Sequence, residues 1–175
     1  MKTVVLIIAE QIFRDEEYEK PKDILEERGI KVLTASTTLV KAFGKLGMVV
    51  KPDILVKDLR NQVLDAVIFI GGGGSSQYFN DATAHEIAKH FNQPGKVIGA
   101  ICIAPVILAN AGLLKGRKAT VFPDGKEALK AGGAIYTGSQ VEIDHSQSNQ
   151  ATVITGCGPE AATAFGEALA ELLAQ

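Results

Sequence analysis

Residues 96–112 constrain the fold more than any other stretch, because an apolar strand passes directly into a helix there. Residues 97–101 form a continuous apolar run typical of a strand buried on both faces. A helical pattern follows over 106–111, and Gly112 supplies its C-terminal stop. No turn-forming cluster separates the two halves, so the chain must change direction within one or two residues.

The polar side chain at that junction is Cys102, with Ala100 and Ala104 two residues to either side. Small residues at these positions suit a nucleophile elbow, here with Cys in place of Ser. At a helix N-terminus, unpaired N–H groups and the helix dipole favour an anion, so we expect a lowered thiol pKa. The plainer interpretation is an inert core residue, because a lone Cys in an apolar run is commonly buried.

Length and composition favour one globular domain, residues 1–175, with 46% hydrophobic residues and a net charge of −2. Without a cluster of Lys and Arg, neither nucleic acid nor an anionic membrane is an expected partner. Two Cys without a CxxC motif and only three His disfavour a zinc site, and we expect no cofactor. The apolar run at 4–9 is too short for a signal peptide, and 97–109 is too short to span a bilayer, so we expect a cytoplasmic protein.

Strands and helices alternate along most of the chain, which predicts an α/β fold of the flavodoxin-like, doubly wound type. The expected sheet is mostly parallel, with helices on both faces and the elbow at Cys102. Strands are predicted at 2–9, 30–35, 66–70, 118–121 and 151–155, a hairpin at 48–51 and 53–56, and shorter extended pieces at 134–136 and 140–143. Helices are predicted at 14–28, at 83–91 with Asp81 as N-cap, at 126–131 and at 159–173.

Ligands of such sheets bind outside the carboxyl ends of the strands, where 71–76, Cys102 and 156–158 all fall. The glycine-rich run 71–76 matches neither G-x-G-x-x-G nor a P-loop. One interpretation is that its backbone N–H groups approach a reacting oxygen that a Cβ would hinder. The other is a flexible turn between strand and helix.

Glu17 and Pro21 form a second informative pair near the end of the first strand. A proline inside a helix clashes with the carbonyl four residues earlier, here that of Glu17, and predicts a distorted turn at this acid. The alternative is ordinary acidic residues at a helix N-terminus, with Pro21 tolerated in the first turn. The residues alone favour the alternative.

Several segments together make the chain resemble the ThiJ/PfpI family, the superfamily of the Parkinson-associated protein deglycase, within the class I glutamine amidotransferase-like fold. They are the opening strand, Glu17 four residues before Pro21, Ile-Gly-Gly at 70–72, Ala-Ile-Cys-Ile-Ala-Pro at 100–105, the run 112–120, and Thr-Gly-Cys-Gly-Pro at 155–159. This resemblance covers nearly the whole length.

The resemblance implies that Cys102 is the reactive cysteine and that a protonated Glu17 hydrogen-bonds its sulfur. An ionised carboxylate there would raise the thiol pKa, whereas a neutral carboxyl donates to the sulfur. Backbone N–H groups of Gly72 and Ile103 would form an oxyanion pocket. The resemblance also implies a homodimer or a higher homo-oligomer.

Three positions depart from the family pattern. Ile103 replaces the His that follows the cysteine in protease-like members, Phe122 replaces a His before Pro123, and Cys157 replaces a common Arg. The usual general bases for Cys–His chemistry are therefore missing. Two residues remain as accessory candidates. Cys157 is either a resolving thiol for Cys102 or a buried structural Cys, and His145 either reaches a neighbouring subunit's site or is a solvated loop residue.

The first functional hypothesis is a glyoxalase III or deglycase-like enzyme acting on small α-oxoaldehydes through Cys102 and Glu17. The alternative is a non-enzymatic redox sensor or chaperone-like stress protein in which an oxidant converts Cys102 to a sulfinate. Ile103 disfavours a third hypothesis, a peptidase.

Overall fold

The computed structural model describes residues 1–145 and 147–175. Its centre is a seven-stranded sheet in the order β11-β12-β8-β7-β1-β3-β6, and within this described sheet only β11 runs antiparallel to its neighbour. The strands are β1 (Thr3–Ile7), β3 (Lys31–Ser36), β6 (Ile54–Leu55), β7 (Ala66–Phe69), β8 (Val97–Ile101), β11 (Val141–Asp144) and β12 (Thr152–Gly156).

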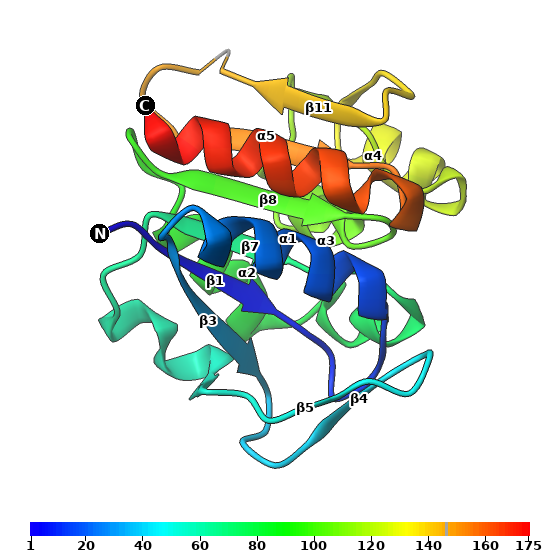
Figure 1. Ribbon diagram of the computed structural model, residues 1–175. Coiled ribbons are helices and arrows are strands. Elements are labelled where there is room, and N and C mark those ends of the chain that lie inside the picture. The colour runs from blue at the N-terminus through cyan, green and yellow to red at the C-terminus, as the bar shows by residue number, and fades with distance from the viewer. Residues whose placement is uncertain (146) are drawn as a thin grey trace.

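Alternate residues of the central strands serve two separate cores, because successive side chains of a strand point to opposite faces. Val4 and Leu6 of β1 pack with α1 (Asp15–Glu27) and α5 (Ala162–Ala174). Val5 and Ile7 pack on the other face, with the 3-10 helix η1 (Val56–Asn61), α2 (Ala82–His90) and α3 (Pro105–Asn110). Figure 1 shows α1 and α5 side by side over one face of the sheet. The predicted doubly wound α/β fold is confirmed.

The strand order places the carboxyl ends of three strands next to one another. From β1 the chain first adds β3 on one side, then crosses to β7 and β8 on the other. This reversal is the topological switch point at which doubly wound sheets bind ligands. The segments after β1, β7 and β8 therefore meet at one edge of the sheet. None of the helices in the described part of the chain combines the length and apolar character needed to cross a bilayer.

The predicted hairpin of 48–51 with 53–56 is wrong. In the structure β5 (Val49–Val50) pairs antiparallel with β4 (Ala42–Gly44), and β4 pairs in parallel with the short β2 (Gln11–Phe13), which the sequence did not indicate. The reversal lies at Gly47, whose φ of +102° suits glycine. β6 instead joins the central sheet beside β3.

The segment after α3 is more irregular than predicted. The strand expected at 118–121 is reduced to β9 (Lys118–Ala119), which pairs with β10 (Ile135–Tyr136) outside the central sheet. Fully buried Arg117 ties this segment to β11, because its Nε lies 3.0 Å from Asp144 Oδ1. The remaining elements are α4 (Lys126–Ala131) and the 3-10 helices η2 (Gly73–Tyr78), η3 (Pro123–Gly125) and η4 (Pro159–Ala161), the last of which begins the predicted helix 159–173.

Candidate active site

Cys102 occupies the predicted elbow. It has a φ of +64°, in the left-handed region that non-glycine residues rarely adopt. Two backbone hydrogen bonds hold it there, from Cys102 N–H to Gly156 O at 2.9 Å and from Phe122 N–H to Cys102 O at 2.8 Å. Ala100 and Ala104 are both fully buried, which leaves no room for larger side chains beside the turn. Such local strain persists because hydrogen bonds from two neighbouring segments, β12 and the start of η3, fix both sides of the residue.

Glu17 reaches the elbow from the first turn of α1. Its side chain is fully buried, and Oε2 accepts a hydrogen bond from Gly71 N–H at 3.0 Å. The other oxygen, Oε1, has no well-aligned partner among the described residues. The Cys102 thiol nevertheless lies close enough to hydrogen-bond the carboxyl and affect its pKa. The acid and the thiol therefore form one buried pair.

Gly71 makes this pairing sterically feasible. A Cβ at this residue would lie 2.5 Å from Glu17 Oε2 and 2.6 Å from Cys102 Cβ. Any larger residue would push the acid and the thiol apart. The glycine therefore allows the strand end, α1 and the elbow to meet.

Pro21 lies well inside α1, so the interpretation of a first-turn proline is wrong. The helix continues through it, although Pro21 offers no N–H to the carbonyl of Glu17. A Cβ at Gly166 of α5 would lie 2.8 Å from Pro21 Cα, so the two helices approach closely here. Pro21 thus contributes to the helix packing that supports Glu17.

Burial has the largest effect on the pKa values of both Glu17 and Cys102. It raises the pKa of Glu17 to about 7, against opposing hydrogen bonds from Cys102 and Gly71. It also raises the pKa of the Cys102 thiol to about 12, and the charge of Glu17 acts in the same direction. The backbone N–H groups of Gly72 and Ile103 hydrogen-bond the sulfur and lower its pKa, but by less.

The expected lowering of the thiol pKa is therefore wrong. α3 begins at Pro105, which has no N–H, and burial outweighs the two N–H groups that do face the sulfur. Because the carboxyl is the stronger acid, above pH 7 the pair holds its shared proton on sulfur. Glu17 is then a carboxylate placed to accept that proton.

A cavity of about 250 Å³ opens on Cys102. One wall is apolar and is formed by Ile103 and Phe122. The rim carries two cations and one carboxylate. The lining residues are Arg14, Lys45, Gly72, Gly73, Cys102, Ile103, Phe122, Asp124 and Pro159.

The structure brings Glu17, Gly72 and Ile103 to Cys102, whereas neither accessory candidate lines the cavity that opens on Cys102. Cys157 is half-buried, its sulfur lies 3.5 Å from Glu160 Oε1, and it does not line the cavity. His145 is exposed and hydrogen-bonds Thr152 Oγ1 at 3.1 Å, at the start of β12 and so at the opposite end of the sheet. It does not reach the Cys102 of its own chain.

Sequence reasoning missed Arg14, Asp15, Lys45 and Asp124. Asp15 is buried, and its carboxylate accepts hydrogen bonds from Leu46 N–H and Met48 N–H, both at 2.9 Å. It thereby fixes the turn that carries Lys45. In sequence Asp15 is indistinguishable from its acidic neighbours at a helix N-terminus, so no local signal marked this role.

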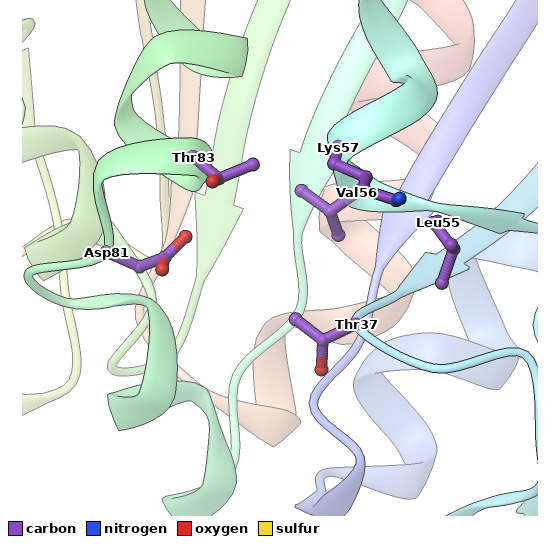
Figure 2. A pocket seen from close by; sticks show the side chains of 6 residues that line it. All are labelled: Thr37, Leu55, Val56, Lys57, Asp81 and Thr83. Carbon is purple, nitrogen blue, oxygen red and sulfur yellow. The ribbon is translucent and has the colours of Figure 1, made fainter.

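A second cavity, of about 210 Å³, lies between η1 and the start of α2 (Figure 2). It is lined by Thr37, Leu55, Val56, Lys57, Asp81 and Thr83. Asp81 is already engaged there as the predicted N-cap, since its carboxylate accepts a hydrogen bond from Ala84 N–H at 2.8 Å. Neither Cys102 nor Glu17 lines this cavity.

Several known proteins resemble this chain in sequence or in structure. The deglycase PYRAB04690 of Pyrococcus abyssi is 33% identical over 80% of this chain and 84% of its own. The glutathione-independent glyoxalase DJR-1.2 of Caenorhabditis elegans is 30% identical over 86% of this chain and 77% of its own. A crystal structure of a ThiJ/PfpI domain protein from Brachyspira murdochii superposes with a TM-score of 0.88 at 29% identity, covering 98% of this chain and 96% of that one.

The model of the DJ-1/PfpI family matches residues 2–172, nearly the whole length. That span includes the acid on α1, the glycines after β7 and the elbow after β8. The chain belongs to the DJ-1/PfpI family.

Proposed function

We propose that this chain converts small α-oxoaldehydes to 2-hydroxyacids, with Cys102 as nucleophile and Glu17 as proton carrier. The observation that supports this most is the buried carboxyl, with a pKa of about 7, against a thiol at a strained elbow. A general base works best when its pKa lies near the operating pH. Relatives that carry the names deglycase and glyoxalase point to the same class of carbonyl substrate.

In the first step the sulfur of Cys102 bonds to the aldehyde carbon. The thiol proton passes to the Glu17 carboxylate, and the C=O electron pair moves onto oxygen. The N–H groups of Gly72 and Ile103, which face the sulfur, are placed to stabilise this oxyanion. Return of the proton from Glu17 to the oxygen completes a hemithioacetal.

In the second step Glu17 removes the hydrogen of the former aldehyde carbon as a proton. The electron pair left behind forms a C=C bond to the adjacent carbon, and the ketone C=O pair moves onto its oxygen, which gives an enediolate. The hydroxyl proton of the first carbon passes to that oxygen, and Glu17 returns its own proton to the adjacent carbon as the C=O bond of the first carbon forms. The first carbon is thereby oxidised to a thioester and the second is reduced to an alcohol. Water from the open cavity then hydrolyses the thioester, which releases the hydroxyacid and restores the thiol.

Lactate formation from methylglyoxal tests this proposal. We expect turnover in the wild type, its loss in Cys102→Ser, and a loss of about 10²-fold or more in Glu17→Gln. Cys157→Ser is the matched control and should retain activity, because its sulfur faces Glu160 and does not line the cavity. If the wild type turned over methylglyoxal no faster than Cys102→Ser, the enzymatic proposal would be wrong.

The oxidant-sensing alternative has less support from the site. Oxidation proceeds from the thiolate, and the raised pKa of Cys102 keeps the sulfur protonated near neutral pH. Intact mass after mild peroxide treatment distinguishes the two. Stoichiometric gain of two oxygens at Cys102, without turnover of any aldehyde, would favour the alternative.

A further inference from the structure

The rim of the Cys102 cavity is charged unevenly. Arg14 and Lys45 line it on the side of α1 and the β4–β5 turn, next to Gly72 and Gly73. Asp124, from η3, lines it beside Phe122. The charge of Arg14 lowers the pKa of Glu17, but the mechanism proposed above assigns no step to any of these three residues.

Arg14 is held in place by a strained backbone. The preceding β2 contains Ile12 at a φ of +59°, an outlier for a β-branched residue. This conformation brings Arg14 N–H to Gly71 O at 3.0 Å, and a Cβ at Gly72 would come within 2.5 Å of Arg14 N. The guanidinium donates through Nε and Nη2 to Glu16, and no described residue accepts from its Nη1. Strain of this kind often marks a functional position.

Tertiary hydrogen bonds also fix the backbone at Lys45. Its backbone N–H donates to Phe13 O at 2.9 Å, and buried Asp15 fixes the following residues of the turn. A Cβ at Gly44 would lie 2.5 Å from Asp15 Oδ1, so the turn lies tightly against that carboxylate. Among the described residues, no carboxylate lies within ion-pair distance of the Lys45 ammonium. The fold thus fixes the backbone of Lys45, and no described carboxylate neutralises its ammonium group.

From this arrangement we infer that the substrate of Cys102 carries an anionic group, a carboxylate or a phosphate, that binds Arg14 and Lys45. This inference rests on the proposed function and adds the substrate class. Asp124 would repel the same group, so the anionic end points toward α1 and the carbonyl toward the sulfur. A guanidinium and an ammonium beside glycine N–H groups are the donors that such anions accept from.

Alkylation of Cys102 tests the cationic rim without requiring any turnover. Iodoacetate and iodoacetamide attack the same sulfur, so the ratio of their rates is independent of how much thiolate is present. At low ionic strength we expect Arg14→Gln and Lys45→Gln each to lower this ratio about two- to fivefold, as for one exposed charge pair. Asp124→Asn should raise it. Lys41→Gln, an exposed lysine that does not line the cavity, is the matched control. An unchanged ratio in the double variant R14Q/K45Q would overturn the inference.

Turnover separates this inference from the proposed function. The paired substrates are neutral 2-oxopentanal and 4,5-dioxopentanoate, which has the same five-carbon chain ending in a carboxylate. Each takes up one water, with aldehyde oxidation balanced by ketone reduction, to give 2-hydroxypentanoate and 2-hydroxyglutarate. We expect a higher kcat/KM for the anion and loss of that preference in the double variant. A phosphate-bearing oxoaldehyde, 3-phosphooxy-2-oxopropanal, shows which anion is preferred.

The two failures look different. Equal kcat/KM for the neutral and anionic substrates would refute the anion preference and leave the proposed function standing. If neither substrate exceeded the Cys102→Ser background while the alkylation ratios changed as expected, the proposed function would fail and the anion-binding rim would stand.

Discussion

Replacing Glu17 with Gln should change how the stability of the protein depends on pH. The native pKa of about 7 exceeds the ordinary carboxyl value of 4.5, so the folded state binds this proton more tightly than the unfolded state. The contribution of Glu17 to the free energy of unfolding is therefore complete below pH 4.5 and is lost as the pH rises through 7. The difference of about 2.5 pH units, at about 1.36 kcal/mol per unit, corresponds to about 3 kcal/mol.

Urea denaturation followed by far-ultraviolet circular dichroism measures this effect, since the chain contains no Trp. Between pH 4.5 and 8, the unfolding free energy of the wild type should fall by about 3 kcal/mol relative to Glu17→Gln. Glu19→Gln, an exposed position on the same helix, is the control and should follow the wild type. If the unfolding free energies of wild type and Glu17→Gln changed in parallel with pH, Glu17 would have an ordinary pKa. The assignment of Glu17 as the base would then be wrong.

Three further predictions rest on the structure, and a fourth rests on the family resemblance. In Glu17→Gln the pH profile of iodoacetamide alkylation at Cys102 should move to lower pH, because one cause of the raised thiol pKa is the charge of Glu17; an unmoved profile would leave burial as the sole cause. Gly71→Ala should cost about 1–3 kcal/mol in urea denaturation and about 10²-fold in turnover, because its Cβ separates the pair; wild-type kinetics would contradict this. Arg117→Met should destabilise by about 3–5 kcal/mol, since it breaks a fully buried ion pair with Asp144, and a change below 1 kcal/mol would count against this. Light scattering should give at least twice the 18.5 kDa chain mass, in line with the homo-oligomer that the resemblance implies, and a monomer mass would refute it.

The sequence predicted well those features that depend on neighbouring residues. The apolar run before Cys102 and the alanines around it define a buried strand and a sharp turn, and the structure has both. Asp81 begins α2 as expected, because an N-cap acts on an N–H only three residues away. Alternating strands and helices predicted the parallel sheet by the same short-range rules.

The tertiary structure alone decided the charges and protonation states of the site. Whether Cys102 has a raised or lowered pKa depends on burial contributed by residues from across the chain, and local helix geometry indicated the wrong direction. Lys45 lines the cavity on a turn that two distant residues hold, Phe13 through its carbonyl and Asp15, thirty-one residues before Leu46, through its carboxylate. Periodicity describes contacts within one element, whereas desolvation and long-range hydrogen bonds arise when separate elements pack together. The sequence by itself therefore determined the scaffold and the position of the sulfur, and the packing of distant segments decided the chemistry around it.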